Sequence, residues 1–204
     1  MGKKIRVMIN PSVQYGNVIR DEVGQEVYNE GENMFDIAWR VKEILDHDDR
    51  FEVYLSRDGR RAPSDLQREV DLANQLECQA FVSLHSDATG QPIDPTQGGS
   101  WTFYATEDER RLAETIHYAG AISSRSVYPE VRDRGVKNHW KRLKVLWDTR
   151  CPASLTEILF HTNPHERTLL KDPSFQQLVA EGFAEGVRRY FFAGSEGGPM
   201  VDRA

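Results

Sequence analysis

The chain has 204 residues, of which 39% are hydrophobic and 28% are charged, and its formal net charge at pH 7 is −6. This length supports one well-buried core and is too short for two full domains. The negative charge argues against a nucleic-acid or anionic-membrane surface, and the apolar runs are too short for membrane insertion. The basic first residues precede no apolar segment, so we expect no signal peptide and synthesis in the cytoplasm.

Strand-like and helix-like segments alternate along the chain. Short apolar or alternating runs predict strands, and apolar residues spaced three and four apart predict amphipathic helices. In chain order, the predicted elements are strand 4–9, helix 32–47, strand 51–56, helix 63–76, strands 80–86 and 99–106, helix 108–127, strands 143–148 and 153–160, and helices 164–170 and 173–192.

This alternation predicts an α/β fold, a single domain with a twisted, mostly parallel sheet and helices on both faces. Residues 1–193 form the predicted domain, and the Gly/Pro-rich residues 194–204 predict a flexible tail. In such sheets, functional sites form beyond the carboxyl ends of the strands.

Two residues in predicted strands can carry chemistry. His85 ends strand 80–86 and precedes a polar loop, which suits a metal-binding or catalytic histidine, although a lone histidine there is more often structural or solvated. Glu157 lies inside an apolar strand, where a buried carboxylate needs a cation, a metal or strong donors.

Two glutamates precede the first predicted helix. Acidic residues at a helix start interact favourably with its dipole, and Glu32 fits that role. Glu30, one turn earlier, is freer to point elsewhere.

The remaining histidines give a weaker signal. His161 and His165 have the spacing of a zinc-binding pair, but the Asn-Pro between them starts a helix, so the two need not share a face. We expect His117 and His139 at the surface or in a substrate cleft.

An ordered set of segments resembles one enzyme family. The segments ENMFDIAWRVKEIL, FEVYLSRDG, ANQLECQAFVSLHSDA, GGSWTFYAT, DRGVK and KVLWDTRCPASLTEILFHTN resemble the zinc-dependent N-acetylmuramoyl-L-alanine amidases of the Amidase_3 type, over roughly residues 4–192. These cell-wall lytic enzymes cut the amide bond between N-acetylmuramic acid and L-alanine in peptidoglycan. The resemblance implies a mixed, six-stranded sheet, peptidoglycan as the partner, Zn²⁺ as the cofactor, and action at the cell wall after release or export by another route.

The resemblance also implies roles for individual residues. Glu30 and His85 match zinc ligands, and Glu157 matches the catalytic glutamate that takes a proton from water. Arg57 and Asn74 match positions that support the site.

The loop after the first strand departs from the family pattern. Most members have a D-P-G-H-G loop with a third zinc ligand, whereas this chain has NPSVQYGN. A subgroup shows S-P-S-x-Q-x-x-N, which Ser12, Gln14 and Asn17 fit. Gln14 is the candidate third ligand, although an amide oxygen binds zinc more weakly than imidazole does.

Substrate-binding candidates are Trp101, Trp140 and Asn17, together with the basic segment 132–144, which suits a sugar and an acidic stem peptide. Two alternatives remain open at this point. One is a metal-free, amidase-like module that binds peptidoglycan or regulates a partner, and the other is a zinc peptidase or amidase that acts on a different amide.

Overall fold

A six-stranded mixed sheet forms the centre of the computed structural model, which describes residues 2–12, 17–90, 94–139 and 143–193. Its strand order is β4-β1-β5-β8-β6-β7. The strands are β1 (Ile5–Pro11), β4 (Phe51–Leu55), β5 (Ala80–Asp87), β6 (Ser100–Tyr104), β7 (Asp133–Asn138) and β8 (Ala153–Phe160). Only the β6–β8 pair is antiparallel among these pairings. The predicted α/β fold with a mostly parallel, six-stranded sheet is confirmed.

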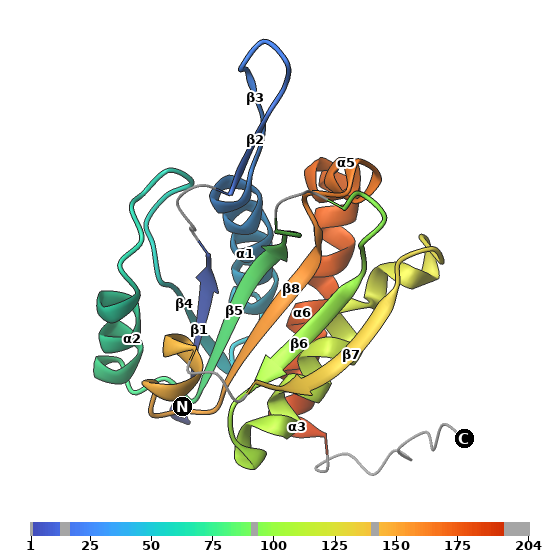
Figure 1. Ribbon diagram of the computed structural model, residues 1–204. Coiled ribbons are helices and arrows are strands. Elements are labelled where there is room, and N and C mark those ends of the chain that lie inside the picture. The colour runs from blue at the N-terminus through green and yellow to red at the C-terminus, as the bar shows by residue number, and fades with distance from the viewer. Residues whose placement is uncertain (1, 13–16, 91–93, 140–142, 194–204) are drawn as a thin grey trace.

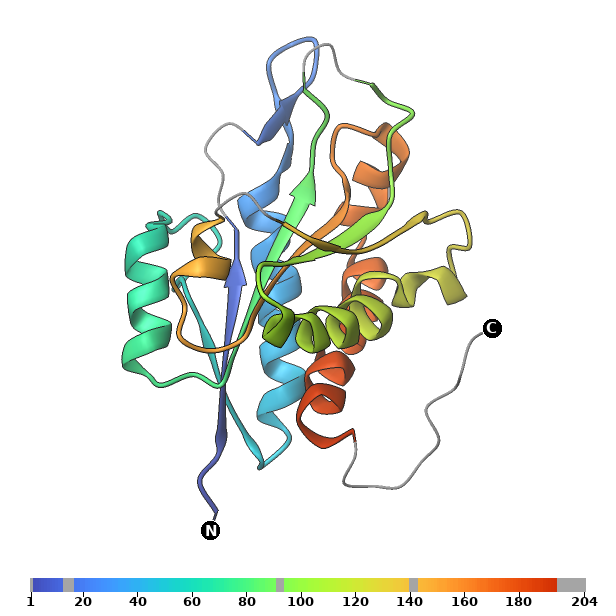
Figure 2. The same cartoon turned by 60° about the horizontal axis from the view of Figure 1, so that its bottom comes forward.

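Helices cover both faces of the sheet (Figures 1 and 2). One face packs against α1 (Glu30–Asp46), α3 (Glu107–Ile116), α5 (Pro164–Lys171) and α6 (Pro173–Phe192). The other face packs against α2 (Leu66–Gln75) and α4 (Lys144–Trp147). In the described part of the chain, no helix has the length and apolar character needed to cross a membrane.

Helix starts follow the local sequence. The Asn163 side chain accepts hydrogen bonds from the backbone N–H groups of His165 and Glu166, and Pro164 occupies the first turn, as predicted. Asn29 caps α1 in the same way by accepting from the N–H of Glu32. The helix therefore includes Glu30, which was expected in the preceding loop.

One further prediction is wrong, and two elements of the structure were not predicted. Residues 143–148 were predicted as a strand, but α4 is a helix that buries the adjacent side chains of Val145 and Leu146. Such a short apolar run does not distinguish the 3.6-residue repeat of a helix from the two-residue repeat of a strand. The sixth strand is instead β7, a polar edge strand without apolar alternation. A hairpin of β2 (Val18–Arg20) and β3 (Glu26–Asn29) also precedes α1 (Figure 1).

His117 was expected at the surface or in a cleft, but it is completely buried. Helix α3 continues into a π-helical turn at His117–Ala121, which directs the imidazole toward the sheet. Its Nδ1 lies 3.1 Å from Thr102 Oγ1 and its Nε2 lies 2.9 Å from Asp133 Oδ1. His117 thus joins β6 and β7 to the helical layer.

This burial predicts an acid-dependent loss of stability. Burial lowers the pKa of His117, although Asp133 acts in the opposite direction. As the pH falls through about 6.5, the unfolded chain binds a proton before the folded chain does, so the free energy of unfolding decreases. We expect a shallower decrease between pH 7.5 and 5 for His117→Gln, measured by urea unfolding. An equal slope in both proteins would show that His117 does not contribute.

Candidate active site

Three of the predicted site residues lie in a row across neighbouring strands. His85 on β5 is the cross-strand partner of Glu157 on β8, and Glu157 is also the partner of Trp101 on β6. Cross-strand partners project from the same face of a sheet. The row lies toward the carboxyl ends of β5 and β8, where the fold class places functional sites.

Glu30 approaches this row from the first turn of α1. Its side chain is fully buried, and its Oε1 atom lies 3.4 Å from His85 Nδ1. Asn17 Nδ2 donates to Glu30 Oε2 at 2.6 Å, and the Ser86 N–H donates to Oε1 at 3.1 Å. Burial raises the pKa of Glu30, but His85, Asn17 and Ser86 lower it below its ordinary value overall. Glu30 is therefore a buried, ionised carboxylate.

The spacing of Glu30 and His85 fits a long hydrogen bond and also fits two ligands of one ion. The 3.4 Å separation exceeds the roughly 2.7–2.9 Å of a charge-assisted hydrogen bond. Ligands about 2.1 Å from a tetrahedral zinc ion lie about 3.4 Å from one another. Carboxylate oxygen and imidazole nitrogen are also ligand types that zinc accepts.

A complete metal shell needs a further donor. Within the ranges that the structure describes, no group of three His, Cys, Asp or Glu residues is arranged to hold a metal. Gln14, the predicted third ligand, lies outside the described residues. Its described neighbours are fixed beside the site, because the Ser12 N–H donates to Leu84 O at 2.9 Å and Asn17 donates to Glu30.

Glu157, the register partner of His85, has an unpaired carboxylate oxygen. Its Oε2 atom is buried and has no hydrogen-bond partner in the described structure. Burial raises the pKa of Glu157 to about 8, although His85 acts in the opposite direction. A buried carboxylate oxygen without a donor is costly, so Glu157 needs a partner that the described residues do not supply.

A bulge in β8 shapes the end of this row. His85 pairs with Glu157 and Asp87 pairs with Phe160, so two residues of β8 lie opposite one residue of β5. The second of them, Leu159, has a left-handed φ of 56°. Bulges redirect the side chains that follow them, and here His161 turns toward β5.

His161 completes a polar network that the sequence analysis did not predict. Its Nδ1 lies 2.9 Å from Ser86 Oγ, which lies 2.7 Å from the Tyr28 hydroxyl. The His161 and Tyr28 rings stack with centroids 5.2 Å apart. This network supports the backbone of Ser86, which donates to Glu30. His165, in contrast, is exposed and contacts Glu130, so His161 and His165 do not share a site.

The other predicted residues have different positions. Trp140 lies outside the described residues, and Asn17 contacts Glu30, so its predicted contact with substrate stays a prediction. Arg57 is buried and donates to Pro11 O and Gly31 O, which ties the end of β1 to the start of α1. Asn74 bonds the backbone after α4 at Asp148 O and the Arg150 N–H.

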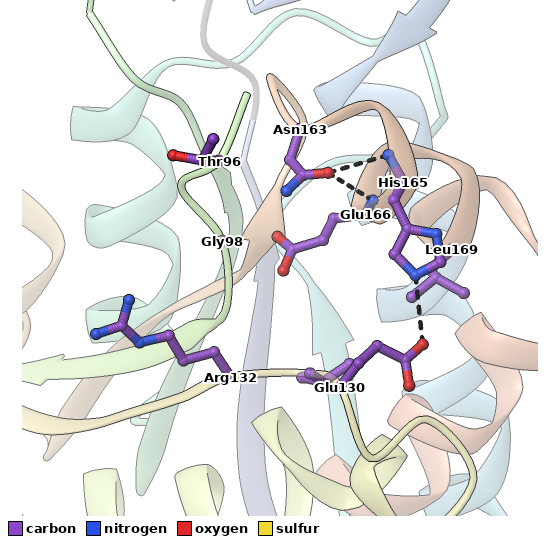
Figure 3. Close-up of a pocket in the computed structure, with 9 residues that line it drawn as sticks. Thr96, Gly98, Glu130, Arg132, Asn163, His165, Glu166 and Leu169 are labelled. Carbon is purple, nitrogen blue, oxygen red and sulfur yellow. Dashed lines mark hydrogen bonds and ion pairs between the residues drawn. The ribbon is translucent and has the colours of Figure 1, made fainter. Parts of the chain in front are cut away.

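A separate cavity of about 300 Å³ lies beside the start of α5 (Figure 3). Glu130 and His165 meet at its edge with 3.3 Å between Oε1 and Nε2. The Glu166 carboxylate in its wall accepts from the N–H groups of Gly99 and Phe160, each at 2.7 Å. Because both Glu166 oxygens have backbone donors, this carboxylate has a structural role that joins β6, β8 and α5.

The Glu30 contacts predict a measurable coupling. Asn17→Ala removes a donor from a buried charge, which costs about 1.5–3 kcal/mol of unfolding free energy. We expect a smaller cost in a Glu30→Gln background, because the charge is then absent. A double-mutant cycle by urea unfolding, with a chelator present, measures this coupling. An equal cost of Asn17→Ala in both backgrounds would contradict the assigned contact.

Comparison with known proteins identifies the family. Residues 8–189 match the Amidase_3 model, described as N-acetylmuramoyl-L-alanine amidase. The endolysin of Bacillus phage SPP1 is 33% identical over 159 residues, which are 74% of this chain and 54% of the endolysin. The germination-specific N-acetylmuramoyl-L-alanine amidase of Bacillus subtilis strain 168 is 25% identical over 178 residues, covering 76% of this chain and 68% of that protein.

Solved structures agree with this match. The crystal structure of N-acetylmuramoyl-L-alanine amidase from Clostridium difficile 630 has a TM-score of 0.80 and 25% identity, over 95% of this chain and 100% of that chain. The present chain spans about half of the length of the phage endolysin, as the 54% coverage shows. Since the family model extends from β1 to α6, the chain belongs to the Amidase_3 family of N-acetylmuramoyl-L-alanine amidases.

Proposed function

We propose that this chain hydrolyses the amide bond between N-acetylmuramic acid and L-alanine in peptidoglycan, with Zn²⁺ as its cofactor. One observation carries the proposal: the unpartnered Oε2 of Glu157 lies one strand from His85, which contacts the buried Glu30. Membership in the family supports the reaction and the substrate class.

Glu30 and His85 would hold the zinc ion, with Gln14 as the third ligand. When bound, zinc polarises a carbonyl and lowers the pKa of a bound water toward 7. Two observations support this ligand set: the 3.4 Å separation of Glu30 Oε1 and His85 Nδ1, and the anchoring of Ser12 and Asn17 beside them. Asn17 and the Ser86 N–H hold the Glu30 carboxylate in one orientation.

Glu157 would serve as the general base. In its ionised form, which a cation bound at His85 would favour over the protonated form, its Oε2 would accept a proton from the attacking water and then deliver one to the leaving nitrogen of L-alanine. Trp101, on the neighbouring strand, and Trp140 are the aromatic candidates for contact with the sugar.

The role of Glu157 predicts a specific loss. We expect Glu157→Gln to lower the release of L-alanine amino groups from purified cell walls by roughly 10²–10⁴-fold, with zinc content unchanged because Glu157 is not a ligand. Exposed Glu181→Gln on α6 is the matched control and should keep full activity. Equal release by Glu157→Gln and the unmodified chain would rule out this base.

The role of Gln14 predicts a change in zinc affinity in both directions. Gln14→Ala removes a ligand and should weaken zinc binding by at least about 10-fold, whereas Gln14→His supplies imidazole and should strengthen it. Competition with a chromogenic chelator measures both affinities. If neither substitution changes the affinity, Gln14 is not a ligand.

A further inference from the structure

Two cations lie against the Trp101 ring, next to the proposed base. The Arg134 guanidinium carbon is 4.1 Å from the ring centroid, and Lys137 Nζ is 4.3 Å from it. Trp101 is the direct cross-strand partner of Glu157. The row that begins at His85 therefore continues through Glu157 and Trp101 to a cationic pair on β7.

A bulge in β7 brings the two cations together. Residues three apart in a regular strand project to opposite faces. Here Ser100 pairs with Asp133 and Thr102 pairs with Val136, so Arg134 and Gly135 both lie opposite Trp101. Gly135 has a φ of +79°, which glycine adopts readily. The extra residue lets Arg134 share the Trp101 face with Lys137.

Among the described residues, no short ion pair neutralises the two cations, although the Asp87 and Glu166 carboxylates interact with Arg134 at longer range. In the described part of the chain, no carboxylate lies within ion-pair distance of either group, and Arg134 donates instead to Gly98 O at 3.1 Å. The two like charges at one ring repel each other. Each cation–π contact stabilises its cation by only about 0.5–2 kcal/mol. Charged residues on an edge strand also discourage strand pairing, a role that exposed Lys137 can serve as well, whereas half-buried Arg134 lies against Trp101.

The spacing indicates which part of a substrate reaches this pair. Neighbouring strands lie about 4.8 Å apart, so Trp101 is about 5 Å from Glu157 and β7 is about 10 Å from it. A peptide advances about 3.3–3.6 Å per residue. The residue after L-alanine therefore reaches the cations that lie over Trp101. The amide-linked muramic acid is neutral, so the anion must come from the peptide.

We infer that Arg134, Lys137 and Trp101 form a subsite for the carboxylate of the second stem-peptide residue. This inference rests on the proposed function and extends it to substrate selection. Arg134 and Lys137 bind the carboxylate by charge-assisted hydrogen bonds, and Trp101 holds both cations in place between substrates. They position the peptide, and Glu157 performs the chemistry.

Two substrates that differ in one group test the subsite. They are N-acetylmuramoyl tripeptides whose second residue is joined to the third through its side-chain carboxyl group, so that its α-carboxyl group is either free or converted to the amide. With the zinc-loaded full chain, we expect about a 10-fold lower KM for the acid form and similar kcat values. Calorimetric Kd values in the Glu157→Gln background should show the same preference.

Substitutions then assign the preference to the pair. Lys137→Gln and Arg134→Gln should each reduce the ratio of the KM for the amide to the KM for the acid from about 10 to about 3 or less. Lys137→Arg keeps the charge and should keep the ratio. Lys171→Gln, which removes an exposed charge from α5, is the matched control and should leave the ratio unchanged.

The outcomes separate the two proposals. Equal KM and Kd values for the acid and the amide, or a ratio unchanged in both Gln variants, would overturn the subsite while leaving the amidase function intact. Hydrolysis of neither tripeptide nor cell walls would overturn the proposed function, and the calorimetric ratio would still decide the subsite.

Discussion

A fully buried carboxylate at the start of α1 is the constraint on which the site depends. An unpaired charge in this position costs several kcal/mol, so Glu30 is stable only when donors surround it. The donors come from separate segments, the loop that contains Asn17 and the end of β5 at Ser86. Folding must therefore bring the α1 start, this loop and the sheet edge together, and that arrangement leaves His85 beside Glu30.

Two bulges adapt a regular sheet to this chemistry. The bulge in β8 at Leu159 directs His161 toward the Ser86 hydroxyl. This contact supports Ser86, whose backbone N–H donates to Glu30. The bulge in β7 at Gly135 brings Arg134 onto the Trp101 face. Between them, the regular pairing of His85, Glu157 and Trp101 supplies a straight row of side chains. The two bulges therefore flank the row of His85, Glu157 and Trp101, and the pairing of these three residues with one another is regular.

Sequence patterns predicted the central strands and the last helix because these elements bury clear apolar faces. They also placed His85 at a strand end and Glu157 inside a strand, and the family resemblance selected Glu30. They missed β7, which is polar, and the inward turn of His117, which depends on a π-helical turn. The basic segment 132–144 was a substrate-binding candidate, but the pairing of Arg134 with Lys137 depends on a bulge, for which the local signal was the glycine within DRGVK.

The most direct test of the metal site is the zinc stoichiometry of the purified chain after dialysis against a limited excess of zinc. One zinc ion per chain is expected in the unmodified protein and in Glu157→Gln. Most of that zinc should be lost in Glu30→Gln and in His85→Ala, because each removes one of two adjacent ligands. Absence of zinc from the unmodified chain, or full retention by His85→Ala, would contradict a metal site built on Glu30 and His85.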